Sequence, residues 1–157
     1  MKQKPILDVT AGSRSMHFNK QNELIHFNDL RSESLMLCDG RLLEVNPDTQ
    51  FDFRKLPFAN EIFHLVIFDP PHLTNVGKDS WLLSKYGQLD KETWKDDISK
   101  GFSECWRVLK PNGTLIFKWS ENQVSVAQVE KLLTIKPICG TRRGKNGIFL
   151  VFFKDQD

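Results

Sequence analysis

Asp69-Pro70-Pro71-His72 is the stretch of this 157-residue sequence with the clearest chemical potential, and it directly follows an apolar run over residues 65–68. A short apolar run without alternation is typical of a strand that is buried on both faces, as in a parallel sheet. Because neither proline can donate a sheet hydrogen bond, the strand must end at or just after Asp69. The sequence thus places an ionisable carboxylate at the carboxyl end of a central strand, where ligands of open α/β sheets bind.

Two earlier segments predict strands that also end near acidic residues. Residues 5–9 form the first predicted strand and lead into a small-residue turn over residues 10–13, from which we expect a helix to start. That arrangement brings backbone amides close to a bound cofactor. Residues 24–28 predict the second strand, which ends at Asp29. The interval of 29 − 8 = 21 residues between Asp8 and Asp29 is close to the ~20 residues that separate a glycine turn from a ribose-binding carboxylate in nucleotide-binding folds.

A β-hairpin is predicted over residues 35–45, because Asp39-Gly40 suits a type I′ turn between two apolar segments. Residues 50–54 predict a third, short strand that carries Asp52. Residues 73–89 predict a long loop, and loops of that length within compact domains are commonly lids or binding loops.

The second half of the chain predicts helix, strand, helix and strand. Apolar side chains recur at steps of three and four after Asp90, the expected N-cap, up to a turn at residues 111–113. Residues 114–119 predict a buried strand, the apolar positions of residues 124–133 a helix, and residues 148–153 a final strand that should run antiparallel. We therefore predict an α/β fold in one domain, residues 1–157, with a mainly parallel sheet, an antiparallel last strand and a small β-hairpin insertion.

The composition narrows the class of protein. The net charge is only +2, which permits nucleic-acid binding without arguing for it. Cys38, Cys105 and Cys139 are widely separated and the histidines are scattered, so we expect no disulfide framework and no metal site. No stretch approaches the ~20 apolar residues of a membrane span, and the N-terminus lacks the pattern of a signal peptide. These features predict a soluble, cytoplasmic domain that does not bind membranes.

The order of these motifs resembles class I S-adenosylmethionine-dependent methyltransferases, and the resemblance covers residues 5–153. Asp-Pro-Pro followed by a ring residue resembles more narrowly the amino-methyltransferase branch, which modifies exocyclic nitrogens of nucleic-acid bases and includes small phage-type DNA methyltransferases. The fold implied is Rossmann-like and doubly wound. The motifs are Asp8-x-x-Ala11-Gly12, Asp29, Asp52 before Leu56-Pro57-Phe58, Asp69-Pro70-Pro71-His72, and Leu109-Lys110-Pro111-Asn112-Gly113.

The resemblance implies that Asp69-Pro70-Pro71-His72 is catalytic. An exocyclic amine is a poor nucleophile because its lone pair is delocalised into the ring. The Asp69 carboxylate would accept one N–H and the Pro70 carbonyl the other, with the direction of that carbonyl fixed by the stiff Pro70-Pro71 backbone. The His72 ring would stack on the base. The alternatives are that Asp69 caps a turn and that His72 caps a helix or loop.

For the cofactor, S-adenosyl-L-methionine, the resemblance implies three groups of contacts. Asp8, Ala11 and Gly12 would line the methionine and ribose end, Asp29 would accept the ribose hydroxyls, and Asp52 with Phe53 would meet the adenine. Arg14 stands where the family carries another glycine. Arg14 could face the methionine carboxylate, or it could be an exposed salt-bridging residue.

Four residues are candidates for binding the substrate. Trp119 ends the predicted strand that follows Asp69, beside Lys118, and is either a substrate contact or a core residue. Arg142 and Arg143 lie in the predicted loop at residues 141–147 and could contact phosphates, or form an ordinary basic turn. Tyr86, together with Trp81 and Gln88 in the long loop, could grip an unpaired base.

The leading hypothesis is an N-methyltransferase for an exocyclic amine of a nucleic-acid base, with adenine N6 in DNA favoured and DNA favoured over RNA. A second reading changes the substrate to a protein amide or a small planar amine. A third is a non-catalytic cofactor-binding module that needs a partner. An NAD-dependent dehydrogenase is disfavoured, because no Gly-x-Gly-x-x-Gly follows the first strand. A single domain of this size predicts weak sequence specificity, or a preference for single-stranded substrate, unless a partner protein or a homodimer supplies target recognition.

Overall fold

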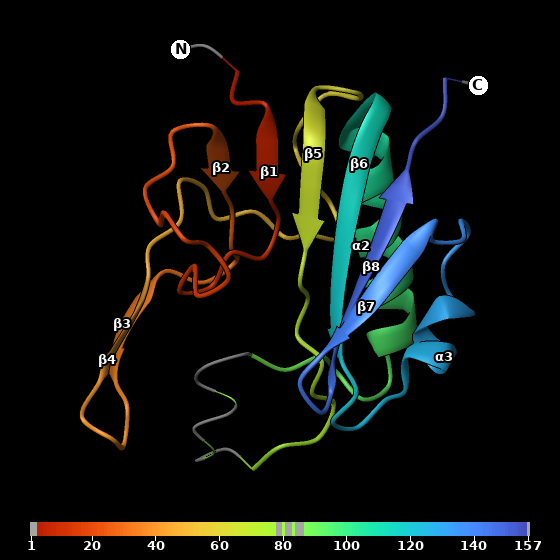
Figure 1. Ribbon diagram of the computed structural model, residues 1–157. Helices are drawn as coiled ribbons and strands as arrows, with labels where there is room; N and C mark the ends of the chain where they lie inside the picture. The colour runs from red at the N-terminus through yellow and green to blue at the C-terminus, as the bar shows by residue number, and fades with distance from the viewer. Residues whose placement is uncertain (1–2, 78–79, 81–82, 84–86, 157) are drawn as a thin grey trace.

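A six-stranded sheet forms the centre of the protein (Figure 1). The computed structural model describes residues 3–77, 80, 83 and 87–156. The strand order is β2-β1-β5-β6-β8-β7, and a separate two-stranded sheet pairs β3 with β4. The strands of the large sheet are β1 (Ile6–Asp8), β2 (Ile25–Phe27), β5 (Phe63–Phe68), β6 (Leu109–Ser120), β7 (Cys139–Arg143) and β8 (Gly147–Phe153).

The direction of the strands follows the predicted pattern. β2, β1, β5 and β6 are parallel to one another, and β8 runs antiparallel to β6. The predicted mainly parallel α/β sheet with an antiparallel strand beside it and a small hairpin is therefore confirmed. β5 lies between β1 and β6, and its residues Val66, Ile67 and Phe68 are buried as the apolar run predicts.

The predicted hairpin is present as β3 (Glu33–Met36) and β4 (Leu42–Val45). Its turn is longer than a two-residue type I′ turn, because Leu37 donates to the carbonyl of Arg41 and Gly40 donates back to the carbonyl of Leu37. Gly40 adopts a φ of 82°, in the left-handed region that glycine tolerates.

Helix α2 (Trp94–Val108) packs the apolar stripe that its sequence periodicity predicts onto β5 and β6. Its N-cap is Thr93, and Asp90 instead accepts the backbone N–H groups of Glu92 and Thr93 in the preceding turn. The core beneath this helix is rich in phenylalanine. Phe68, Phe102, Phe117 and Phe152 are almost fully buried there.

Gly101 allows α2 to approach the sheet closely. A Cβ atom at this position would lie 2.5 Å from Cδ2 of Phe53 and 2.7 Å from Cζ of Phe68. Real Cβ atoms do not come so near to other side chains, so only glycine fits without a shift of its neighbours. The position of Phe53 is therefore coupled to the sequence of α2.

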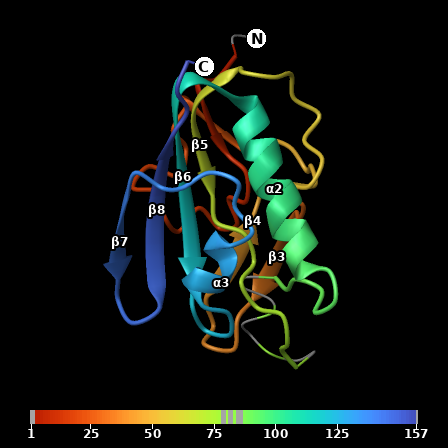
Figure 2. The same cartoon turned by 90° about the vertical axis from the view of Figure 1, so that its right-hand side faces the viewer.

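Helix α3 (Val126–Glu130) is shorter than the predicted segment and begins with a capping box between Ser125 and Gln128. Figure 2 shows α2 and α3 on the same side of the large sheet. Residues 10–24, where a helix was expected to start, form turns instead. We call the side of the sheet opposite α2 the open face. At β5, β6 and β8 its partly or fully exposed residues are Leu65, Thr114, Ile116, Lys118, Phe149, Val151 and Phe153.

Two further expectations were wrong. Residues 50–54 form no strand, because the side chain of Asn28 binds this segment in place of a neighbouring strand. Residues 141–147 are not simply a loop, because Cys139–Arg143 form β7, which pairs antiparallel with β8 at the edge of the sheet. Every residue of β7 is exposed, so no apolar pattern marked this strand. Of the helices in the described part of the chain, none is long and apolar enough to cross a membrane.

Candidate functional site

A cavity of about 350 Å³ lies at the carboxyl ends of β1, β2 and β5, and we call it the central cavity. Asp29, Asp52, Phe53, Asp69 and Pro71 line it, so the structure brings together five of the predicted site residues from three separate segments. Ligands of parallel sheets bind at this edge because the chain leaves each strand there and frees side chains and amides.

Asp69 faces this cavity at the point where β5 ends. Its backbone N–H donates to Thr10 Oγ1 at 3.0 Å, and its Oδ2 lies 2.7 Å from Lys118 Nζ. Oδ1 accepts no hydrogen bond from residues 3–77, 80, 83 or 87–156, and the side chain keeps 25% of its surface exposed. Burial raises the pKa of the Asp69 carboxyl, and the positive charge of Lys118 opposes that rise. One carboxylate oxygen thus remains available to a ligand.

The lining of the central cavity carries an excess of negative charge. Its carboxylates belong to Asp29, Asp52, Asp69, Asp90 and Asp97, and its cations are Arg31 and Arg54. Arg54 is held by Asp52 at 2.6 Å and by Asp97 at 3.1 Å, and its hydrogen bonds lower the pKa of the Asp52 carboxyl. The remaining walls are apolar and include Val9, Leu30, Phe51 and Leu89. A ligand with a positive charge and a flat apolar part would suit such a cavity.

Asp29 ties the turn after β1 to the end of β2. Its Oδ2 accepts the backbone N–H of Gly12 at 2.8 Å, and its Oδ1 accepts the backbone N–H of Arg31 at 2.9 Å. Gly12 has a φ of 51°, a conformation in which a side chain is disfavoured. Asp29 therefore holds the predicted turn in place from the wall of the central cavity.

Asp8, Ala11 and Gly12 do not line the central cavity. Asp8 is buried on the open-face side of β1, and its Oδ2 lies 2.6 Å from Nε2 of His17. Burial raises the pKa of the Asp8 carboxyl against the lowering effect of His17. In this structure, then, Asp8 holds the segment after β1 through His17.

His72 and Trp119 are buried beside the cavity without lining it. Nε2 of His72 lies 3.1 Å from Nδ2 of Asn122, and its ring meets the Trp119 ring edge-on. Burial, with a contribution from Lys118, lowers the pKa of His72 to about 4, so the ring is neutral near pH 7. Trp119 donates its indole N–H to the carbonyl of Val124 at 2.9 Å. Pro70 is buried as well. The rings of His72 and Trp119 do not line the central cavity and are not placed to stack on a ligand there.

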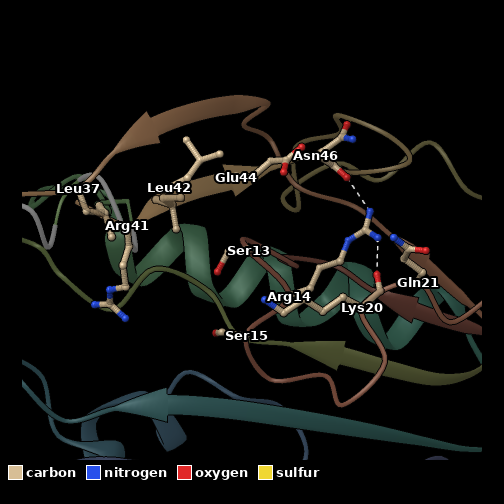
Figure 3. Close-up of a pocket in the computed structure, with 11 residues that line it drawn as sticks. Ser13, Arg14, Ser15, Lys20, Gln21, Leu37, Arg41, Leu42, Glu44 and Asn46 are labelled. Atoms are coloured by element: carbon tan, nitrogen blue, oxygen red, sulfur yellow. Dashed lines mark hydrogen bonds between the residues drawn. The ribbon is translucent and has the colours of Figure 1, made fainter. Parts of the chain in front are cut away.

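Arg14 stabilises the turns after β1. It has a φ of 56°, lies over the Phe27 ring at 3.9 Å, and donates to the carbonyl oxygens of Lys20 and Asn46 at 2.6 Å each. Figure 3 shows these two bonds in a separate outer cavity, of about 510 Å³, between this segment and the β3–β4 hairpin. The outer cavity shares no lining residue with the central cavity. Neither predicted role of Arg14 matches these contacts.

The remaining candidates are dispersed. Arg142 pairs with Glu121 at 2.7 Å, and Arg143 lies at a third cavity, which also borders Lys118. Tyr86 and Trp81 lie outside the described residues, whereas Gln88 lines the central cavity and donates to the carbonyl of Thr74.

Asn28 is a structural residue of the site that the motifs did not identify. It is fully buried and donates from Nδ2 to the carbonyls of Val9 and Phe51, both at 2.9 Å. Its Oδ1 accepts from Thr49 Oγ1 at 2.8 Å and from the N–H of Phe51 at 3.0 Å. These four bonds hold the segment that presents Asp52 and Phe53 to the cavity. A polar residue at the end of an apolar strand was the available signal.

The comparisons with known proteins support the fold. No protein-family model matches the sequence, and a search of curated proteins finds no relative. A solved structure from Pyrococcus horikoshii is similar with a TM-score of 0.62 at 16% identity, over 98% of this chain and 83% of that one. A SAM-dependent methyltransferase from Methanosarcina mazei gives 0.58 at 14% identity, over 100% and 95% of the two chains. One from Leishmania major gives 0.51 at 10% identity, over 94% and 63%. The chain therefore shares the Rossmann-like fold of these solved structures, two of which are named as SAM-dependent methyltransferases.

Proposed function

We propose that this protein is an S-adenosyl-L-methionine-dependent N-methyltransferase of the amino-methyltransferase branch, acting on an exocyclic amine of a nucleic-acid base, with adenine N6 in DNA the favoured target. One observation carries the proposal. The Asp69 carboxylate stands at the end of the central strand, on the wall of a cofactor-sized cavity, with Oδ1 uncommitted among the described residues.

The central cavity suits S-adenosylmethionine in the charge and the apolar character of its lining. The cofactor carries a sulfonium and an ammonium group against one carboxylate, and five carboxylates face two guanidinium groups in the lining. Phe51 and Phe53 offer apolar walls for the adenine, and Asp52 lies beside them. Two of the similar solved structures bear the name of SAM-dependent methyltransferases, which supports the same cofactor here.

The proposed chemistry needs an amine made more nucleophilic and held in line. When bound, S-adenosylmethionine supplies an electrophilic methyl group, so that an N–CH₃ bond forms as the S–CH₃ bond breaks and the electron pair stays on sulfur. Oδ1 of Asp69 would accept one N–H of the amine and localise its lone pair, and the proton released from nitrogen would pass to this carboxylate or to water. Alignment of two reactants can lower a barrier by ~7–11 kcal/mol, which reduces the need for other catalytic groups.

Lys118 and His72 have supporting roles in this proposal. Lys118 lies 2.7 Å from Asp69 Oδ2 and stabilises the ionised carboxylate that the amine requires. His72 is a positioning residue, because its bond to Asn122 fixes the loop that follows Pro70 and Pro71. His72 then does not stack on the base, and other aromatic rings take that role.

The proposal is tested with the purified chain and S-adenosylmethionine labelled in its methyl group. Single-stranded DNA, duplex DNA, RNA and a protein pool are offered as separate acceptors, and the modified nucleoside is identified after digestion by liquid chromatography. The expected product is N6-methyladenine in DNA. If only the protein pool becomes labelled, the substrate is a protein and the proposed nucleic-acid substrate is wrong. Cofactor binding by calorimetry without transfer to any pool would favour the non-catalytic module.

A further inference from the structure

The open face carries a cavity of about 360 Å³ that is separate from the proposed cofactor site. We call it the face cavity. It lies between the turns after β1 and the start of β8, and its lining includes Met16, His17, Phe18, Lys118, Arg143 and Phe149. Its volume falls within the range of about 300–1,000 Å³ that is usual for small-ligand sites. It shares no lining residue with the central cavity.

The geometry points to the face cavity as the acceptor subsite: the base of a single-stranded nucleic acid enters from the open face, lies against Phe18 and Phe149, and places its phosphate beside Arg143. This inference rests on the proposed function and names where that substrate binds.

The Asp69–Lys118 ion pair connects the two cavities. Ile67 pairs with Ile116 in the β5–β6 ladder, and alternate residues of a strand point to the same side. Asp69 lies two residues after Ile67, and Lys118 lies two residues after Ile116, so both side chains lie on the open face. Asp69 lines the central cavity, Lys118 lines the face cavity, and the two charged groups are 2.7 Å apart. An amine that reaches the ion pair from the face cavity therefore arrives one carboxylate away from the cofactor cavity.

The lining also has the chemistry that binds a base. Phe18 is fully exposed, and its ring contacts no other ring in the described part of the chain, although burial of a phenylalanine is favourable. Phe149 is partly exposed on β8. Stacking on aromatic side chains is the common way in which proteins hold unpaired bases, and it tolerates any base because each has a π face. Two aromatic rings at one cavity thus offer a place for a flat acceptor.

Arg143 supplies a cation for the phosphate. It is exposed, lines the face cavity and forms no ion pair within residues 3–77, 80, 83 and 87–156. Its neighbour Arg142 is paired with Glu121 at 2.7 Å and lines none of the three cavities. The chain therefore provides a matched pair of adjacent arginines, of which only Arg143 should contact the acceptor.

The missing cover on this face explains how a strand of nucleic acid could reach the ion pair. Among the helices of the described residues, Figure 2 shows none on the side of the sheet opposite α2, and residues 15–18 line the face cavity there together with Lys118 and Phe149. Lys118 is 28% exposed and is therefore accessible from this side.

The test measures binding as well as transfer. Fluorescence anisotropy follows a 5′-fluorescein-labelled deoxyadenosine decanucleotide as it is titrated with the full chain, with S-adenosylhomocysteine present. We expect Phe18→Ala and Arg143→Ala each to raise the dissociation constant about tenfold. Arg142→Ala should change it less than twofold. Arg143→Ala should also reduce the slope of log K against log salt by ~0.7, the value for one phosphate contact on a single strand.

Calorimetric titration with S-adenosylhomocysteine should give the same affinity for all three variants, because none of these side chains lines the central cavity. Unchanged oligonucleotide affinity in Phe18→Ala and Arg143→Ala, an equal loss in Arg142→Ala, or no binding by the wild-type chain would overturn the inference. Binding that depends on Phe18 and Arg143 without methyl transfer would uphold the subsite and refute the proposed function. Methyl transfer that neither substitution affects would uphold the proposed function and refute the subsite.

Discussion

Gly101→Ala tests how closely α2 and the cofactor cavity are coupled. The added methyl group would lie 2.5 Å from Phe53 Cδ2 and 2.7 Å from Phe68 Cζ. Phe68 is fully buried, whereas Phe53 is only partly buried and lines the central cavity. Phe53 is therefore the side chain that can move, and its movement would alter the wall of the cavity.

The expected change in stability is the difference between two effects. Overpacking of a core costs ~1–3 kcal/mol, and replacing glycine by alanine within a helix gains ~1 kcal/mol. The variant should therefore be less stable by ~0–2 kcal/mol, and its affinity for S-adenosylhomocysteine should fall severalfold. Without the steric conflict, the same substitution would raise the free energy of unfolding by the full ~1 kcal/mol expected when alanine replaces glycine in a helix.

Urea unfolding measures the free energy of unfolding, and calorimetry measures the affinity for S-adenosylhomocysteine. Ser103→Ala is the control, because Ser103 is exposed on the same helix. That variant should gain a few tenths of a kcal/mol and bind the ligand normally. A Gly101→Ala variant that is ~1 kcal/mol more stable than the wild type, with unchanged affinity, would refute the close packing of Phe53 on α2.

Three further predictions concern the residues around the site. If the ionised Asp69 is required, the rate of methyl transfer should fall as the pH drops through its raised pKa, and Lys118→Met should move this acidic limb to higher pH in a pH–rate profile. His72 binds a proton less readily in the folded chain, with a pKa of about 4 against 6.5, so stability should fall as the pH drops from 6.5 towards 4, by at most ~1.4 kcal/mol per unit. Urea unfolding at several pH values should show a flatter dependence for His72→Gln. Asn28→Ala removes four hydrogen bonds in the core and should cost ~2–4 kcal/mol in the same assay, whereas a loss below ~0.5 kcal/mol would contradict the role of Asn28.

The parts of the fold that were predictable depend on local sequence. The end of β5 follows from two prolines that cannot donate to a ladder, and the β3–β4 hairpin follows from Asp39-Gly40 between apolar segments. Helix α2 follows from apolar residues at helical spacing. In each case the residues that decide the structure are neighbours in the chain.

The parts that were not predictable depend on partners distant in the sequence. β7 has no buried residue and forms only because the edge of β8 is available to it. The segment at residues 50–54 alternates like a strand, yet Asn28 takes up its backbone hydrogen bonds. Asp69 with Lys118 and His72 with Asn122 are separated by 49 and 50 residues. Motif spacing could place Asp69 at the sheet edge but could not show which side chains it meets there.

The central claim is that the Asp69 carboxylate acts on the acceptor amine and not on the cofactor. Its most direct test compares Asp69→Ala with Asp96→Asn, which removes an exposed carboxylate on α2 that pairs with Lys100 at 2.6 Å. The measurement is single-turnover transfer of a labelled methyl group to single-stranded DNA, together with calorimetry of S-adenosylhomocysteine binding. We predict that Asp69→Ala lowers transfer at least about a hundredfold with ligand affinity retained within severalfold, while Asp96→Asn matches the wild type. Transfer by Asp69→Ala at the wild-type rate would contradict the account.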